Sequence, residues 1–389
     1  MKAAVARHRA KQAILKESAP STQRLFDPYF IIIVIALVAI GLIMVASASM
    51  AISERQFHQP FHYLFRQLLY MAFGGLVLLV LVRVPLKFWY ESSGTLLFTG
   101  MFLLVLILVP GLGHQVNGST RWLSFGPIGI QVSEFVKLAI ILYLAGYLTR
   151  RNDEVRTQIS GFIKPMAILG VIVCLLLMEP DFGAATVIMI TALAMMYLSG
   201  VRLWQFAVLL LIVIVAMAGL AVMSPYRMAR LTAFLNPWAY QFNSGYQLTQ
   251  SLIAFGRGGI DGVGLGGSVQ KLFYLPEAHT DFLFAVLAEE LGLLGILSVI
   301  ALYLMLIWRI LLMGRRAQLV GNHFAGFAAY GFGIWFGIQA FVNMGVNAGV
   351  LPTKGLTLPL LSYGGSSMLI IFIVIAILLR VDYESRQYA

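Results

Sequence analysis

The chain has 389 residues, of which 60% are hydrophobic and only 11% are charged. A soluble globular domain carries about twice that charged fraction, and the mean hydropathy of +0.88 also indicates a membrane protein. The net charge of +11 does not indicate nucleic-acid binding, because six of the 27 Lys and Arg residues lie in the first 24 positions and most others flank apolar runs. The single cysteine, Cys174, excludes an intrachain disulfide and a Cys-based metal site.

Long uncharged runs predict membrane-spanning helices, because roughly 20 apolar residues are enough to cross the hydrocarbon core. The first 25 residues are basic and polar, so we expect no cleavable signal peptide. The apolar runs do not alternate as the strands of a barrel would. We therefore expect an all-α integral membrane protein with about ten transmembrane helices. The predicted spans are 29–48, 64–83, 93–110, 131–149, 161–178, 182–200, 203–223, 282–313, 323–349 and 362–380.

The distribution of basic residues predicts the orientation. With the N-terminus in the cytoplasm, 18 Lys and Arg residues fall on the inside and 8 on the outside. Cytoplasmic loops carry this excess, so both termini are expected inside. The expected organisation is a basic cytoplasmic tail (1–27), a membrane domain (28–381) and a cytoplasmic C-terminal tail (382–389).

Three outer segments are long or rich in Gly, Pro and polar residues: 111–130, 224–281 and 350–361. The second, between the seventh and eighth spans, is the longest, and long loops without a core of their own are usually functional. Chemistry is therefore expected on the outer face. Since ATP is absent there, any reaction must start from an already activated substrate.

The densest polar cluster closes the longest outer segment. Lys271, Glu277, His279 and Asp281 lie within eleven residues, directly before an apolar helix. Asp281 could be the N-cap of that helix or a general base at the membrane surface. His279 could be a hydrogen-bonding loop residue or a catalytic one.

Two acids and a glycine-rich segment accompany this cluster. Glu289 and Glu290 lie inside the following span, where acids are costly and usually face a cavity or a partner, so pairing with basic residues is expected. The segment 255–268 could be a flexible hinge or could present backbone N–H groups to phosphate.

Other charged residues stand alone or as pairs. Arg121 and Trp122 could hold a phosphate and a lipid or sugar ring, or could be an interfacial anchor. Lys354, between two prolines, could be an anion site or a surface lysine. Glu134 and Lys137 are three residues apart and can pair on one helix face. No His, Cys or acid spacing matches a metal motif.

From about Asp27 to about Tyr388 the chain resembles the SEDS family (shape, elongation, division and sporulation). Five motifs in order carry the resemblance: Asn117-Gly118-Ser119 with Arg121-Trp122; Gln131 with Ser133-Glu134 and Lys137; Pro180-Asp181 with Gly183; Tyr274 to Phe282; and Pro352-Thr353-Lys354-Gly355 with Ser362 to Ser367. Ala278 and the basic tail favour the cell-division branch, because the elongation branch usually has Arg at that position. Glu179 departs from the pattern, since Gln is common there.

The resemblance implies a peptidoglycan glycosyltransferase that polymerises lipid II at the outer face of the bacterial inner membrane, at the division septum. Asp281 would deprotonate the acceptor sugar's 4-hydroxyl, which attacks the donor's anomeric carbon and releases undecaprenyl diphosphate. Arg121, Lys271 and Lys354 are the candidate cations for the diphosphate, and Trp122 would line the lipid or sugar groove. Glu277 and His279 are also expected to contact substrate.

The resemblance further implies partners: lipid II and the nascent glycan strand, a class B penicillin-binding transpeptidase (FtsI type) and divisome activators (FtsQ/FtsL/FtsB type). No cofactor is evident, although a divalent cation such as Mg²⁺ could bridge the diphosphate. Two other functions stay open on the sequence, a lipid II flippase and a non-catalytic divisome scaffold.

Overall fold

The computed structural model describes residues 25–116, 119–125, 128–201 and 225–387, together with Trp204, Val208, Leu211, Val215 and Gly219. Within these residues eight helices are long and apolar enough to cross a membrane. They are α2 (Pro28–Phe57), α3 (His62–Leu81), α4 (Leu86–Ile107), α5 (Val132–Arg150), α7 (Ile159–Met178), α12 (Leu283–Leu319), α13 (His323–Asn347) and α14 (Gly365–Gln387). A shorter apolar helix, α8 (Phe182–Leu198), follows α7.

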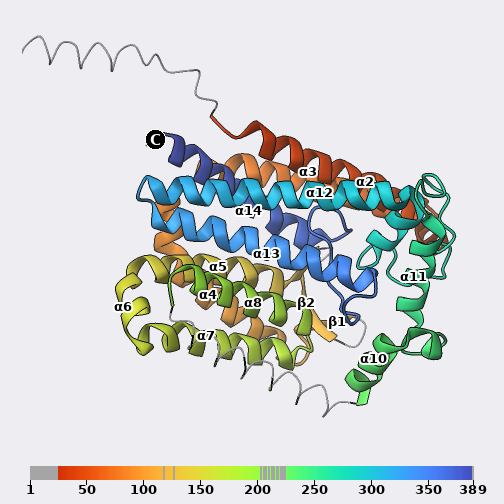
Figure 1. Cartoon of the computed structure of the whole chain (residues 1–389), viewed down its shortest axis with the longest axis horizontal. Helices are drawn as coiled ribbons and strands as arrows, with labels where there is room; N and C mark the ends of the chain where they lie inside the picture. Colours follow the sequence, from red (N-terminus) through yellow and green to blue (C-terminus); the bar gives the residue numbers. More distant parts are fainter. Residues whose placement is uncertain are drawn as a thin grey trace, which may run out of the picture.

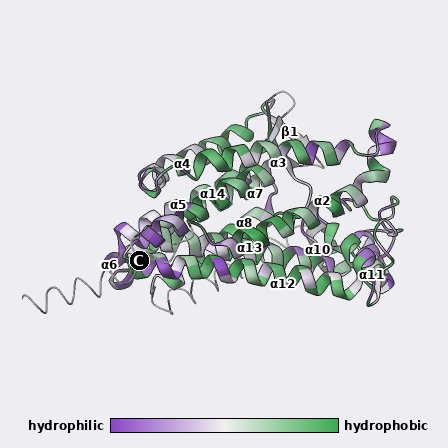
Figure 2. Ribbon diagram, turned by 90° about the horizontal axis from the view of Figure 1, so that it is seen from above, coloured by the Kyte–Doolittle hydropathy of each residue, from purple (hydrophilic) through white to green (hydrophobic). Residues whose placement is uncertain are grey.

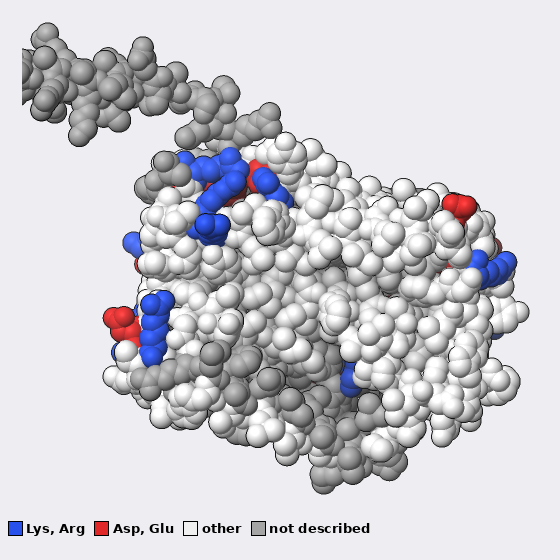
Figure 3. Space-filling model, viewed as in Figure 1, with Lys and Arg blue, Asp and Glu red and all other residues white. Residues whose placement is uncertain are grey.

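The expected all-α membrane fold is confirmed, and nine of the ten predicted spans coincide with α2, α3, α4, α5, α7, α8, α12, α13 and α14. The predicted seventh span, 203–223, lies mostly outside the described residues. The long helices run side by side across the molecule (Figure 1). On the face shown in Figure 3, most charged side chains gather at the two ends of the molecule, and the surface between them is largely uncharged apart from a small basic patch. This arrangement matches a bundle that crosses an apolar layer.

Helix α5 is the central helix of the bundle. In the most apolar 18-residue stretch of α5, 83% of the residues are buried, whereas only 11% are buried in the corresponding stretch of α3. Helix α5 packs against α4, α8 and α13, and α13 packs in turn against α12. The hydrophobic colouring extends along most of the length of these ribbons, and hydrophilic residues concentrate near α6 (Asn152–Thr157) and α11 (Tyr246–Gly258) (Figure 2).

The first outer segment differs from the expected irregular loop. It forms a three-stranded antiparallel sheet of β1 (Gly113–Val116), β2 (Ser119–Phe125) and β3 (Ile128–Gln131), in the order β1-β2-β3. Trp122 on the middle strand is paired with His114 on one side and Gln131 on the other. Short strands rich in Thr, Trp, Phe and Ile satisfy their backbone groups by pairing, and they leave no long apolar run that hydropathy could detect.

The longest outer segment forms α10 (Pro225–Leu235), the 3₁₀ helix η1 (Pro237–Tyr240) and α11, followed by turns that lead to α12. Helix α11 packs against α12 at the end of the bundle opposite the C-terminus (Figure 1).

The end of the bundle that carries the start of α2 and the end of α14 is held together by an ion-pair cluster. Asp27 accepts hydrogen bonds from Tyr29 N and Phe30 N at the start of α2, and Arg309 of α12 is ion-paired with it. The backbone N–H of Asp27 donates to Asp382 Oδ2 at 2.7 Å, and Arg386 also contacts that carboxylate, at 2.9 Å. These contacts explain why α14 continues to Gln387, beyond the predicted domain boundary at 381.

Candidate functional site

Outer segments that are far apart in sequence meet around Asp281. A Cβ atom added to Gly355 would lie 2.8 Å from Asp281 Oδ2, so the carboxylate packs directly against the backbone beside Lys354. Lys354 Nζ lies 5.1 Å from the centre of the Phe182 ring at the start of α8, within the range of a cation–π contact. The Leu356 side chain also packs against Gly183 at the start of α8. Segments 179–183, 277–282 and 352–356 therefore form one site.

The structure rejects the capping interpretation of Asp281. Helix α12 begins at Leu283, its N-cap residue is Phe282, and no side chain caps it. Asp281 lies one residue before the cap and is partly exposed. Its carboxylate is therefore not used by the helix and is available for another role.

Two asparagines of α13 fix the backbone of Asp281, and sequence reasoning did not identify them. The side-chain amides of Asn343 and Asn347 donate to the Asp281 carbonyl at 2.8 and 3.0 Å. Asn343 also donates to the carbonyl of Leu356 at 2.5 Å, and Asn347 Oδ1 accepts from Ala285 N at 3.1 Å. One helix thus holds both the segment that carries Asp281 and the segment that carries Lys354.

The surroundings make Asp281 a stronger base than an ordinary aspartate. Burial raises the pKa of its carboxyl to about 7, and the negative charge of Glu277 adds to the rise. Arg121 opposes the shift in this pKa, and Asp181 adds to it. A carboxyl with a pKa near the working pH suits general-base catalysis.

Arg121 reaches this site from strand β2. Its guanidinium donates to the carbonyl of Pro180 at 2.5 Å and lies 3.8 Å from Asp181 Oδ1. Asp181 accepts from Ala184 N and so caps the start of α8. These contacts hold a cation beside the Asp281 segment.

Glu179 is a second perturbed acid on the same turn. It is fully buried, and burial raises the pKa of its carboxyl to about 8, with Asp181 adding to the rise and Arg121 opposing it. At neutral pH it is therefore mostly a neutral acid. This explains how the turn accommodates an acid at a position where the resemblance leads us to expect the uncharged Gln.

Trp122 and His279 occupy different parts of the site. Trp122 is partly exposed, and its ring lies across Gly129 of the neighbouring strand, where an added Cβ would be 3.3 Å away. His279 is buried between Tyr63 and Tyr363, with ring centres 4.6 and 5.7 Å away. Burial lowers the pKa of His279, so it packs as a neutral imidazole.

Glu277 and Lys271 lie on the same outer segment in different surroundings. Glu277 accepts a hydrogen bond of 2.7 Å from the Thr280 hydroxyl. Lys271 is largely buried, and its ammonium contacts Glu290 at 2.7 Å and the Ser47 hydroxyl at 2.8 Å. Because its ammonium is paired with a fully buried carboxylate, Lys271 is a weak candidate for binding diphosphate.

The prediction that Glu289 and Glu290 pair with basic residues is confirmed. Glu289 contacts Arg257 at 3.1 Å and accepts from the backbone N–H groups of Val269 and Gln270 at 3.1 and 3.3 Å. Both acids are fully buried. Together with Lys271 they fasten the end of the long outer segment to α12.

Part of the glycine-rich segment packs against the backbone of α12, which disagrees with a free hinge there, and its expected contact with phosphate stays a prediction. Val263 N and Gly264 N donate to the carbonyls of Glu289 and Glu290, each at 3.0 Å. An added Cβ on Gly262 would lie 2.2 Å from the Glu290 carbonyl oxygen, and Gly292 breaks the regular geometry of α12 with φ 62°. The backbone around Gly262 is thus packed directly against α12.

The predicted Glu134–Lys137 pair is confirmed as a buried network. Lys137 Nζ contacts Glu134 and Gln339, each at 2.8 Å. Gln339 also accepts from Trp335 and donates to the carbonyl of Thr357 at 2.9 Å. The network therefore supports the turn that follows Lys354.

The comparisons with known proteins decide the family. Residues 28–387 match the family model of FtsW, RodA and SpoVE, described as "Cell cycle protein". The chain belongs to this family. The predicted resemblance is confirmed.

Curated relatives agree with the division branch. The chain is 60% identical to "Probable peptidoglycan glycosyltransferase FtsW" of Legionella pneumophila over 93% of this chain and 92% of the relative. It is 57% identical to the protein of the same name from Coxiella burnetii, over 93% and 97% of the two chains.

Solved structures share the fold. One chain from "Structural coordination of polymerization and crosslinking by a peptidoglycan synthase complex" superposes with a TM-score of 0.77 and 27% identity, covering 92% of this chain and 98% of that one. RodA of Thermus thermophilus gives a TM-score of 0.70 and 26% identity, covering 94% and 99%. Members of the family are thus similar over nearly the whole of this chain.

Proposed function

We propose that this chain is a peptidoglycan glycosyltransferase that polymerises lipid II into glycan strands during septal wall synthesis. The family match and the names of the relatives support the activity. The observation that carries the proposal is the Asp281 carboxyl, whose pKa is held near 7 at a site that Arg121 and Lys354 also approach. A base and two cations at one end of a membrane bundle suit a substrate that carries both a hydroxyl and a lipid diphosphate.

In the proposed reaction the ionised Asp281 carboxylate takes the proton from the acceptor's 4-hydroxyl. The freed oxygen attacks the anomeric carbon of the donor sugar, and the bond from that carbon to the diphosphate oxygen breaks with inversion. The leaving diphosphate carries away the bonding electrons and its charge is stabilised by Arg121 and Lys354. Trp122, partly exposed on β2, offers a flat surface to a sugar ring or the lipid.

The proposed site faces the outside of the inner membrane, with both termini in the cytoplasm. The excess of basic residues at the end with the C-terminus supports this orientation. We further propose that a class B transpeptidase and divisome activators bind the chain at the septum. The similar solved chain from a peptidoglycan synthase complex, which coordinates polymerisation and crosslinking, supports a transpeptidase partner.

The proposed chemistry needs no resident cofactor, since the base and cations are side chains. Within the described part of the chain no three His, Cys, Asp or Glu side chains gather as metal ligands. A divalent cation such as Mg²⁺ could still arrive with the diphosphate, because Mg²⁺ often binds through substrate phosphates and one or two carboxylates.

Polymerisation of purified lipid II tests the proposal. The wild type and Asp281→Asn would be compared in complex with the transpeptidase. Binding of the transpeptidase does not require glycosyl transfer, so it shows whether the variant is folded. We expect glycan chains from the wild type and none from the variant. Normal polymerisation by Asp281→Asn would overturn the general base. If the intact wild-type complex does not polymerise lipid II but the protein transports lipid II across vesicle membranes, a flippase would be favoured.

A further inference from the structure

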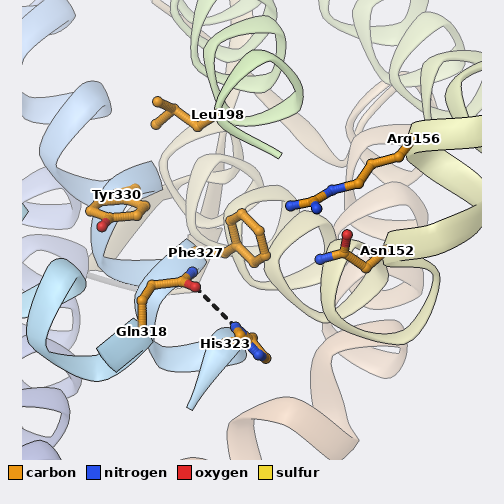
Figure 4. Close-up of a pocket in the computed structure, with 7 residues that line it drawn as sticks. All are labelled: Asn152, Arg156, Leu198, Gln318, His323, Phe327 and Tyr330. Carbon is orange, nitrogen blue, oxygen red and sulfur yellow. Dashed lines mark hydrogen bonds between the residues drawn. The ribbon is translucent and has the colours of Figure 1, made fainter. Parts of the chain in front are cut away.

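A cavity lies at the end of the bundle opposite Asp281. Its volume is about 280 Å³, and Figure 4 shows the seven residues that line it. They come from α6, the end of α8, the end of α12 and the start of α13: Asn152, Arg156, Leu198, Gln318, His323, Phe327 and Tyr330. None of them takes part in the proposed glycosyl-transfer site.

The polar side of the cavity is suited to an anion. Arg156 Nε donates to the carbonyl of Ser199 at 3.0 Å, which fixes the side chain, and its two terminal nitrogens point toward Phe327 and the cavity (Figure 4). The Asn152 amide lies beside them. None of the seven lining residues is acidic. A bound phosphate would meet one full positive charge and an amide donor.

The start of α13 adds to this potential. The helix begins at His323, and it runs for 25 residues. The N-terminal end of a helix carries a partial positive charge that favours anions. His323 is held by a contact of 2.9 Å between its Nδ1 and Gln318 Oε1, so the ring is fixed at the edge of the cavity.

The other side of the cavity is apolar. Leu198 is exposed at the end of α8, and Phe327 and Tyr330 complete this wall. In the proposed orientation these helix ends lie at the cytoplasmic end of the bundle, where lipid head groups would meet it. A ligand that fits both sides has a phosphate and an attached apolar chain.

We propose that this cavity binds the phosphate head group of an anionic phospholipid from the cytoplasmic leaflet, with the acyl chains beside Leu198. Basic pockets between transmembrane helices on the cytoplasmic side bind anionic head groups in other membrane proteins. A free phosphate ion shares the anionic chemistry but cannot use the apolar wall. The inference depends on the membrane orientation and not on the glycosyl-transfer activity.

Native mass spectrometry of the full chain tests the site. The protein would be released from nanodiscs of mixed phosphatidylglycerol and phosphatidylcholine, and the retained lipids counted. We expect retained phosphatidylglycerol for the wild type and about five- to tenfold weaker retention for Arg156→Gln, since one basic residue near the surface contributes about 1 kcal/mol to anionic lipid binding. Equal retention of the two lipids by the wild type would overturn the proposal.

Matched variants separate the cavity from general surface charge. Arg151→Gln removes an exposed arginine that pairs with Glu154 at 3.6 Å outside the cavity, and we expect it to retain lipid like the wild type. Asn152→Asp places a negative charge in the cavity and should weaken retention even if Arg156→Gln fails to fold. Equal loss for Arg151→Gln and Arg156→Gln would show that only surface charge acts.

Inorganic phosphate distinguishes the two sources of the anion. We expect millimolar phosphate to leave the bound phosphatidylglycerol in place, because the free ion lacks acyl chains. Complete displacement of the lipid by phosphate would contradict a lipid site and indicate a site for a free anion.

Discussion

At the scale of single residues, the neighbours of Asp281 determine how much base is present at neutral pH. Burial raises the pKa of Asp281 most, the charge of Glu277 raises it further, and Arg121 acts in the opposite direction. Since Glu277 also accepts from Thr280, it can be changed to Gln without losing a hydrogen-bond acceptor. The charge of Glu277 can therefore be tested separately from its shape.

Glu277→Gln should move the pH–rate profile of polymerisation to lower pH. Removing a negative charge lowers the pKa of Asp281, so its carboxylate stays ionised in more acidic solution. The measurement is the apparent pKa of kcat/KM for the variant and the wild type. A profile that stays in place, or moves to higher pH, would show that Glu277 does not act on the base.

Asn343→Leu should lower kcat by about 10- to 100-fold, because small displacements of a catalytic group have effects of that size. The change leaves the carbonyls of Asp281 and Leu356 without the Asn343 donor. Asn322→Ala is the control, since Asn322 caps the other end of the same helix. We expect it to cost about 1 kcal/mol of stability with kcat nearly unchanged. Equal loss of kcat in both variants would assign the effect to the helix as a whole.

The sequence predicts some of these residues and misses others for a physical reason. Asp281, Arg121 and Lys354 stand out because each is a charged residue in a predicted outer segment, which is visible locally. Asn343 and Asn347 act on Asp281 across 62 and 66 positions, and within an apolar span they look like tolerated polar residues. The ion pair of Lys271 with Glu290 likewise depends on how the outer segment folds back on α12.

At the scale of elements, the contact between α11 and α12 depends on glycine. An added Cβ on Gly258, the last residue of α11, would lie 2.0 Å from the carbonyl oxygen of Ala288. The backbones can approach this closely only without a side chain. The site depends on the same contact, because α12 begins two residues after Asp281.

Gly258→Ala should therefore destabilise the protein and reduce polymerisation. Gly256→Ala is the matched control on the same helix, since nothing lies within 4 Å of an added Cβ there. For the control we expect a gain of up to about 1 kcal/mol, because Ala is the better helix former. Thermal unfolding in one detergent measures both variants. Equal Tm values would contradict the close packing.

Hydropathy predicts the long helices well because each satisfies its own backbone hydrogen bonds within the membrane. It fails for β1–β3, whose strands are short and whose hydrogen bonds join different segments. Glycine content also misleads at Gly262, which suggests mobility but packs against the backbone of α12. Pattern alone cannot distinguish a flexible glycine from one that permits close contact.

At the scale of the whole molecule, the account requires the Asp281 end to face outward. Labelling of single cysteines in intact cells with an impermeant maleimide tests this in a Cys174→Ser background. Leu265→Cys, at an exposed position beside α11, should react from outside. Leu319→Cys, exposed at the other end of α12, should react only after the membrane is opened. The reverse pattern would invert the orientation and place the proposed site in the cytoplasm.

The pH dependence of lipid II polymerisation tests the central claim most directly. If Asp281 is the general base and its pKa is about 7, kcat/KM should fall about tenfold per pH unit well below that value, because only the ionised carboxylate accepts the proton. It should reach a plateau above it. A rate for the intact transpeptidase complex that stays constant between about pH 5.5 and 8 would contradict the assignment of Asp281 as the base.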